Sequence, residues 1–162
     1  MNRSLHLAVV AAAALVLGAC SSYGPESLSP GTPVAEVRNA MGQPTNEYPG
    51  PNGARRLEYA KGPYGLHTFM IDIDAQGRMI GSQQVLTRAT FDTIRVGMSR
   101  DEVLYRIGRP AETSALPYQN RQLWSYRYDA IFCEWFQLSL NPRGEVVDTG
   151  YGPDPICTSE DE

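Results

Sequence analysis

Few residues of this 162-residue chain are of the types that carry out catalysis. It has two histidines, of which only His67 lies outside the apolar N-terminal run. A catalytic histidine needs a nucleophile or an orienting acid as its partner, and no serine or cysteine here stands in a nucleophile motif. We therefore expect His67 to be an ordinary surface side chain and the protein not to be an enzyme.

Metal ligands are equally scarce. Residues 72–77 read Asp-Ile-Asp-Ala-Gln-Gly and resemble the beginning of a calcium-binding loop. Such a loop requires a glutamate at its twelfth position, where this chain has none, and the segment has the composition of a hairpin turn. No histidine and cysteine stand at the spacing of zinc ligands. The sequence predicts neither a metal site nor a cofactor.

Cys20 is the residue for which the sequence predicts a chemical modification. Residues 1–19 have a basic start, an apolar run over residues 5–17 and an exit of small residues, which is typical of a secretory signal peptide. The run is too short to span a bilayer. Residues 17–20 read Leu-Gly-Ala-Cys, which resembles the bacterial lipobox, whose cysteine becomes the first mature residue and carries acyl chains. We expect Cys20 to be lipidated and to hold the chain at a membrane; the alternative is an ordinary signal peptide.

The segment behind the anchor, residues 20–30, is rich in serine, proline and glycine and is expected to form a flexible tether. Ser21 and Ser22 follow Cys20 directly and no aspartate does, as in lipoproteins sorted to the outer membrane of Gram-negative bacteria. We expect the folded part to face the periplasm. The acidic tail, residues 158–162, is expected to be solvated.

The two other cysteines, Cys133 and Cys157, are predicted to form a disulfide, because an even number of cysteines in an exported chain favours pairing. Two free thiols are the alternative. The chain has a net charge of −4 and no basic stripe, so nucleic acid is not expected as a partner.

A repeated sequence motif indicates which structural elements position these residues. Residues 31–44 read GTPVAEVRNAMGQP and residues 97–110 read GMSRDEVLYRIGRP, so glycine, glutamate, valine, glycine and proline recur 66 positions apart. A repeat of this size indicates one supersecondary unit used twice. We expect a first unit over residues 31–88 and a second over residues 89–157.

Each unit is predicted to begin with a short helix. In the second unit Ser99 and Glu102 have the spacing of a capping box, and Gly108 ends the helix. In the first unit Thr32 precedes Pro33, which is expected at the first helical position. Helices of this length are not stable alone, so each needs a sheet to pack on.

Three strands are predicted to follow each helix. Apolar alternation and turn residues place them at 55–60, 69–73 and 78–86 in the first unit, and at 121–128, 136–140 and 145–149 in the second. Hairpin turns are expected at 74–77 and 141–144. The predicted fold is α+β, with two tandem units of a helix packed on one face of a three-stranded antiparallel meander.

Alternation along the strands separates a core face from an open face. The expected core side chains are large and apolar: Leu57, Tyr59, Phe69, Ile71, Ile73, Trp124, Tyr126, Phe136, Leu138 and Leu140. The opposite, open face is the candidate binding surface, and it would carry Arg56, Glu58, Met70, Asp72, Ser125, Arg127, Trp135 and Gln137. Trp135 is its most prominent member, because aromatic residues are favoured at the centres of interfaces.

The second unit also carries a family pattern. Residues 94–110 combine I-x-x-G-M-S-x-x-x-V with I-G-R-P, a Trp-Ser-Tyr strand follows at 124–126, and a hairpin runs from Phe136 to Gly144. This pattern resembles the SmpA/OmlA (BamE) domain family, with Ile107 in place of the usual leucine. The first unit matches less well, since Thr32 replaces methionine and Leu57 replaces tryptophan. The tandem arrangement looks like the fold of β-lactamase inhibitory proteins.

The resemblance implies an outer-membrane lipoprotein that binds protein partners of the envelope, among them the β-barrel assembly machinery, and phospholipid. We therefore expect a lipid-anchored, non-catalytic binding module that acts in outer-membrane protein assembly or envelope integrity. The alternative is a lipid-anchored inhibitor of a periplasmic or secreted hydrolase, whose target would sit in a concave sheet. A hydrolase with a site that sequence does not reveal is the second alternative.

Overall fold

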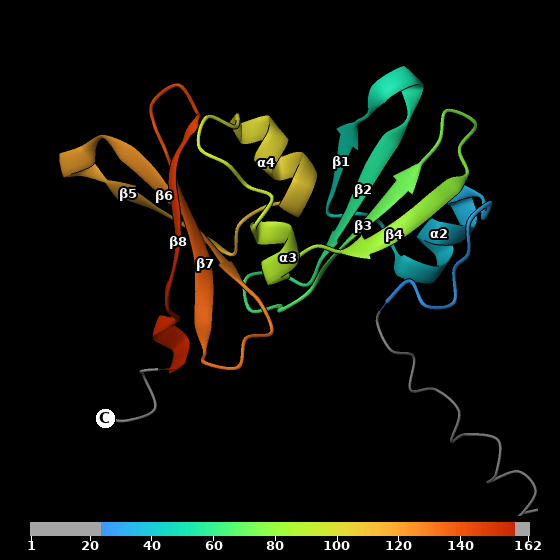
Figure 1. The fold of residues 1–162 in the computed structure, drawn as a ribbon. Coiled ribbons are helices and arrows are strands. Elements are labelled where there is room, and N and C mark those ends of the chain that lie inside the picture. The colour runs from blue at the N-terminus through green and yellow to red at the C-terminus, as the bar shows by residue number, and fades with distance from the viewer. Residues whose placement is uncertain (1–23, 158–162) are drawn as a thin grey trace, which may run out of the picture.

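The structure is a computed structural model that describes residues 24–157; the predicted signal peptide, Cys20 and the acidic tail lie outside this part of the chain. Residues 24–157 form two antiparallel sheets of four strands each. In both sheets, neighbouring strands follow one another along the chain (Figure 1). The expected mixed α+β class is confirmed.

A short helix precedes each sheet. The first unit consists of α2 (Val34–Met41), β1 (Asn46–Pro49), β2 (Arg55–Ala60), β3 (Thr68–Ile73) and β4 (Met79–Gln84). The second unit consists of α4 (Arg100–Ile107), β5 (Glu112–Leu116), β6 (Arg121–Arg127), β7 (Glu134–Leu140) and β8 (Val146–Pro153). The four-residue helix α3 (Arg88–Phe91) connects the units, and the 3₁₀ turns η1 (Pro51–Gly53), η2 (Pro117–Gln119) and η3 (Pro155–Cys157) lie outside the sheets.

The prediction of three strands in each unit is wrong, because each sheet has one more strand at its edge. β1 and β5 contain mainly polar or small residues, and most of their side chains are exposed or half-buried. An edge strand is held by backbone hydrogen bonds to one neighbour and needs no apolar face. Its sequence therefore lacks the alternation by which strands are recognised.

The four groups of elements form successive layers. Figure 1 shows the β5–β8 sheet, then α4 and α3, then the β1–β4 sheet, and finally α2 on the far side. Each sheet packs on the helix of its own unit, but α4 also contacts the other face of the first sheet, where Arg56 donates a hydrogen bond of 3.0 Å to the carbonyl of Tyr105. The second unit thus covers the face of the first sheet that we predicted to be open to solvent.

The helix ends follow the predicted chemistry, with one correction. Ser99 caps α4 in a complete capping box with Glu102, and Gly108 is the C-cap. In α2 the N-cap is Pro33 and no side chain caps the helix, whereas we expected Pro33 inside it. Thr32 instead donates from its hydroxyl to the carbonyl of Ser29 over 2.8 Å.

The repeat extends to irregular parts of the backbone. Both hairpins have a glycine with φ of 78°, at Gly77 and at Gly144. An isolated bridge joins the segment before each helix to its hairpin: Pro33 pairs with Arg78, and Ser99 pairs with Glu145. The duplication therefore preserved backbone geometry where side chains have diverged.

Two apolar clusters form the interior. The smaller one lies between α2 and the first sheet and consists of Val37, Met41, Leu57, Tyr59, Ile71, Ile73 and Met79. The larger one surrounds α4 and α3 and also includes Met70, Val85 and Leu86 from the first unit. Nine of the ten expected core residues are buried, and Phe69 is half-buried. The interior of the second unit is therefore shared between the units.

The predicted disulfide is confirmed: Cys133 is bonded to Cys157, with their Cα atoms 6.4 Å apart. The bond ties the segment before β7 to η3. At the other end of the chain, Leu28 packs against the smaller cluster, although residues 20–30 were expected to be a flexible tether. The chain is thus attached to the first unit before α2 begins.

Candidate functional site at the seam between the units

The first half of the predicted open face is covered by the second unit. Glu58 and Met70 are completely buried, and Arg56 and Asp72 are half-buried. The expectation of a wet face is therefore wrong here, because alternation along a strand shows which side chains share a face but not what packs on it. We refer to the region where the first sheet meets α4 and the loop after it as the seam.

The second half of the predicted face is also largely covered. Ser125, Arg127 and Trp135 are buried, whereas Gln137 is half-buried and donates a hydrogen bond of 2.9 Å to the hydroxyl of Ser125. The guanidinium carbon of Arg127 lies 5.1 Å from the centre of the Trp135 ring. Trp135 is therefore a packing partner of Arg127 and not the exposed centre of a binding surface.

Glu58 is the central polar residue of the seam. It projects from β2, and one of its carboxylate oxygens accepts the phenolic hydrogen of Tyr48 over 2.5 Å. The other oxygen accepts the backbone N–H of Arg109, which follows α4, over 3.3 Å. A buried carboxylate needs such donors, because burial without them is costly. Glu58 thereby joins the first sheet to the end of α4.

Arg56 makes a second connection to the same helix end. Its guanidinium forms a two-point ion pair with Asp72, with distances of 2.7 and 3.1 Å, and also donates to the carbonyl of Tyr105. The last carbonyls of a helix have no partner within it and carry partial negative charge. Arg56 is thus suited to hold the C-terminal end of α4.

A buried ion pair lies at the other side of the seam. Arg127 on β6 binds Asp154 through two hydrogen bonds of 2.7 and 3.1 Å, and both side chains are more than nine-tenths buried. The remaining guanidinium nitrogen donates to the carbonyl of Pro63 over 2.9 Å. Arg127 therefore anchors the loop between β2 and β3 of the first unit to the second sheet.

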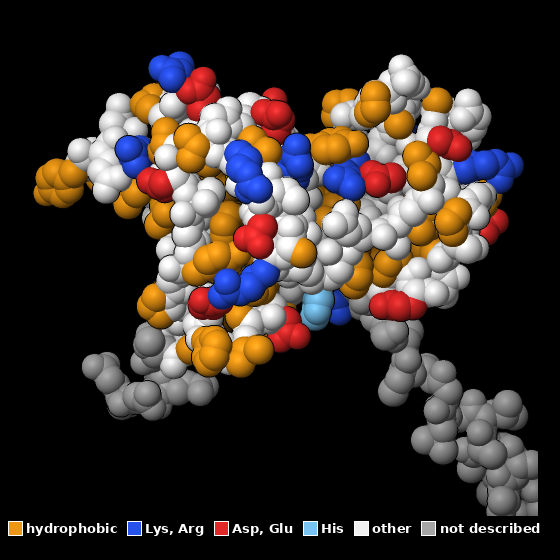
Figure 2. Space-filling model, viewed as in Figure 1, with side chains coloured by type: hydrophobic (Ala, Val, Ile, Leu, Met, Phe, Trp, Pro, Cys, Tyr) orange, Lys and Arg blue, Asp and Glu red, His pale blue; other side chains and the backbone are white. Residues whose placement is uncertain are grey.

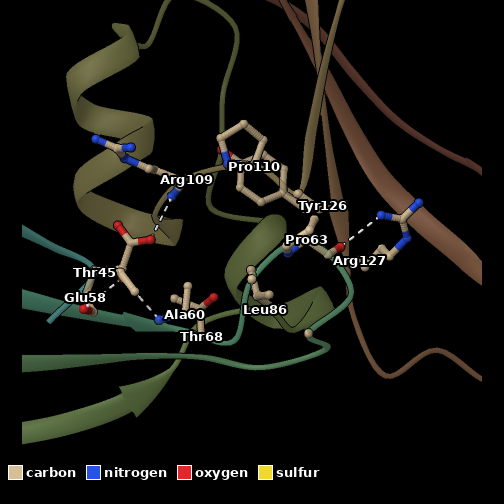
Figure 3. A pocket seen from close by; sticks show the side chains of 13 residues that line it. Thr45, Glu58, Ala60, Pro63, Thr68, Leu86, Arg109, Pro110, Tyr126 and Arg127 are labelled. Carbon is tan, nitrogen blue, oxygen red and sulfur yellow. Dashed lines mark hydrogen bonds between the residues drawn. The ribbon is translucent and has the colours of Figure 1, made fainter. Parts of the chain in front are cut away.

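Between these two connections lies a pocket of about 250 Å³. Figure 3 shows Glu58 and Arg127 on opposite sides of it, with Arg109 and Tyr126 also lining it. Most of the residues that line it are apolar or small, among them Leu86, Pro110 and Ala111. The carboxylate of Glu58 and the guanidinium of Arg127 are already bonded to partners within the protein. The pocket lining contains no cysteine, histidine or serine.

Burial changes the acidity of the tyrosines around the seam. The pKa of Tyr126 is raised well above its ordinary value, first by burial and then by the charge of Glu58. The pKa of Tyr48 is also raised, first by burial, then by its hydrogen bond to Glu58 and by the charge of that carboxylate. Away from the seam, burial and then the hydrogen bond to Glu134 raise the pKa of Tyr128 to about 12.

These tyrosines predict that the protein loses stability at high pH. The folded protein holds their protons more tightly than the unfolded chain, whose tyrosines ionise near pH 10. The contribution is complete below about pH 10 and, for Tyr128, is lost as the pH rises toward about 12. We expect the urea midpoint to fall over this range and to fall less in Tyr128→Phe. If tyrosinate absorbance of the folded protein rises in a single step near pH 10, the prediction fails.

His67 is exposed and its ring stacks on Phe69, with centroids 6.3 Å apart. Among residues 24–157, no group of three or more histidine, cysteine or acidic side chains could hold a metal ion. No helix in this range is long and apolar enough to cross a membrane.

The sequence did not single out Asp154, Tyr48 or Arg109 as functional residues. Asp154 stands in a proline-rich C-terminal segment without a motif, and nothing in its surroundings indicates that it pairs with Arg127. Arg109 contributes its backbone, which any residue type other than proline would do. Gly108 was identified as a helix stop, but its position against Glu58 was not foreseen.

Comparison with known proteins gives no assignment. No protein-family model matches the chain, and no curated protein matches it. A crystal structure of an extracellular protein containing a SCP domain from Bacillus anthracis str. Ames is 12% identical; the match covers 85% of this chain and 48% of that chain, with a TM-score of 0.34. A cysteine-rich secretory protein from Staphylococcus aureus subsp. aureus Mu50 is 8% identical over 78% of this chain and 44% of that one, with a TM-score of 0.29. The chain spans about half the length of these proteins, and the likeness is too low to support an inference.

Proposed function

We propose that this protein is a lipid-anchored binding module of the bacterial envelope, composed of two BamE-like units and without catalytic activity. Its lipid would be carried by Cys20, and its folded part would face the periplasm from the outer membrane. Its role would lie in outer-membrane protein assembly or envelope integrity, through contacts with protein partners.

The observation that supports a binding role is the use of the buried charged residues. In residues 24–157 these are Glu58, Arg127 and Asp154. Glu58 and Arg127 each hold one unit against the other, and Asp154 holds Arg127. Charged groups that bond the two units to each other set the shape of the surface that a partner would contact. They are not presented to a substrate.

The alternative of an inhibitor receives no such support. It supposed that a target enzyme is held in a concave sheet made by both units. The eight strands instead form two separate sheets, with α4 between them. The seam pocket of about 250 Å³ is also small for a loop of another protein.

The anchor is tested by Cys20→Ala. We expect this variant to leave the washed membrane fraction and to appear in the soluble periplasmic fraction, because the lipid would no longer be attached. Ser22→Ala is the matched control and should remain in the membrane fraction with incorporated acyl chains. Retention of Cys20→Ala at the level of the unchanged protein would contradict the proposal.

The partner is tested by crosslinking in intact membranes followed by identification of the captured proteins. Capture of subunits of the β-barrel assembly machinery would support the assembly role. Capture of a hydrolase whose activity falls on binding would instead support the inhibitor.

A further inference from the structure

The exposed apolar side chains of this protein are concentrated at one end. The large hydrophobic residues exposed within residues 24–157 are Tyr64, Leu66, Ile80, Val96, Tyr118, Ile131, Phe132 and Ile156. Five of these eight lie in three neighbouring segments: the β2–β3 loop, the β6–β7 loop and η3. We call these five residues, Tyr64, Leu66, Ile131, Phe132 and Ile156, the apolar end. Figure 2 shows hydrophobic side chains at the lower end of the molecule, and Figure 1 shows the two loops there.

Contacts between residues of these segments fasten the apolar end together. Phe132 and Ile156 each adjoin a cysteine of the Cys133–Cys157 disulfide, which therefore brings them near one another. Tyr64 is held on the same side by Arg127, whose guanidinium carbon lies 5.6 Å from the centre of its ring. Arg127 in turn binds Asp154, two residues before Ile156. The three segments thus form one surface.

The tip of this surface is a loop with two adjacent apolar residues in the open. Ile131 is 94% exposed and Phe132 is 83% exposed. The next residue, Cys133, has a φ of 45°, a conformation that residues other than glycine seldom adopt. Cys133 is held there by the disulfide and by its carbonyl, which accepts the N–H of Asp154 over 3.1 Å. The residue behind the tip is thus held in a costly backbone conformation, while the two apolar side chains remain exposed.

The described chain begins on the same side of the molecule, below the first unit. Figure 1 shows the chain entering the first unit from the side on which the β2–β3 and β6–β7 loops lie. Gly24 is separated from Cys20 by only three residues, which span at most roughly 14 Å. An acyl chain on Cys20 would therefore hold the side of the protein that carries these loops toward the bilayer.

We propose that the apolar end is a membrane-contact surface, on which Ile131 and Phe132 enter the apolar–polar boundary of the lipid layer. The proposal rests on the lipid anchor of the proposed function. Lipid is favoured over a protein partner because the most exposed members are at a projecting loop tip, whereas protein interfaces bury side chains in close-fitting patches. A second, weaker attachment of this kind would fix the orientation of the folded part, since one lipid alone leaves it free to turn.

Insertion is measured by fluorescence quenching with the lipidated protein in vesicles of phosphatidylethanolamine and a minor share of phosphatidylglycerol, prepared with brominated acyl chains. Phe132→Trp places a fluorescent probe at the tip, and Tyr118→Trp places one at a fully exposed residue outside the apolar end. We expect strong quenching of the probe at 132 and little at 118. The background from Trp124 and Trp135 is measured in the unchanged protein.

Binding without the anchor is measured with the Cys20→Ala protein and the same vesicles. We expect weak sedimentation with lipid that falls at least about 10-fold in Ile131→Ser/Phe132→Ser, since the apolar area at the tip is removed. Tyr118→Ser should leave it unchanged. Because the contact is apolar, it should persist in high salt.

Failure of the proposal and failure of the anchor give different results. If Cys20→Ala releases the protein from membranes but the probe at 132 is quenched no more than the probe at 118, the anchor holds and the membrane-contact surface is refuted. If the probe at 132 is shielded only in native membranes and crosslinks to a protein there, the apolar end is a protein interface and the proposal is again overturned.

Discussion

Gly108→Ala is expected to lower the free energy of unfolding by about 4 kcal/mol, one of the two largest losses that we predict for a single substitution. Gly108 has a φ of 74° and a ψ of −164°, a region that is essentially restricted to glycine and costs other residues about 1–3 kcal/mol. A β-carbon here would also lie 2.9 Å from the carboxyl carbon of Glu58 and 3.1 Å from the terminal carbon of Met70. Both neighbours are completely buried, so overpacking adds about 1–3 kcal/mol.

Gly42→Ala provides the matched control. Gly42 occupies the equivalent position after α2, with a φ of 83° and a ψ of −166°, but nothing lies within 4 Å of its β-position. It should lose only the conformational part, about 2 kcal/mol. The difference between the two variants, measured by urea unfolding, isolates the contact between the units. Equal losses would show that α4 does not approach Glu58 in solution.

Arg127→Ala is expected to cost about 3–5 kcal/mol of stability. Removing one partner of a buried ion pair leaves the other charge without compensation, and here Asp154 would remain buried. The loop at Pro63 would also lose its attachment. Urea unfolding measures the loss, and substitution of Asp154 in the same protein should recover part of it.

Arg143→Ala is the control for the loss of an arginine. Arg143 pairs with Glu145 at the surface, with its own side chain 77% exposed, and such pairs contribute at most about 1 kcal/mol. If Arg127→Ala unfolds no more easily than Arg143→Ala, then Arg127 does not join the units. Arg127 would then be available to bind a partner, as its predicted place on the open face of the strand suggested.

The local structure of this protein was largely predictable from its sequence. The capping residues Ser99 and Glu102, the glycine stops and the hairpin glycines each act over a few positions, so their effect is visible in a short segment. The strands around Ile71 and Leu138 were recognisable because large apolar residues recur at alternate positions in each. The edge strands β1 and β5 were missed because their stability comes from backbone pairing, which leaves no pattern in side chains.

The candidate binding surface was mispredicted because burial there depends on contacts between the units. Alternation placed Met70 and Glu58 correctly on one face, but it carries no information about an element that arrives from 50 residues further along the chain. The apolar side chain of Met70, on a face expected to contact water, was a local sign that another element covers the first sheet. The sequence around Asp154 did not indicate that this residue is buried, because its pairing with Arg127 depends only on where the two residues lie in the folded protein.

The packing of α4 on the first sheet also shows what surface a further unit would need. A repeat protein can grow as long as each unit offers the surface that docks the next. At the positions of Arg56 and Glu58, the second sheet has Leu123 and Ser125, which offer neither a cation for a helix end nor a carboxylate for a backbone N–H. The second sheet therefore lacks the docking surface of the first, and a third copy added by duplication would find no matching surface there until those two residues changed.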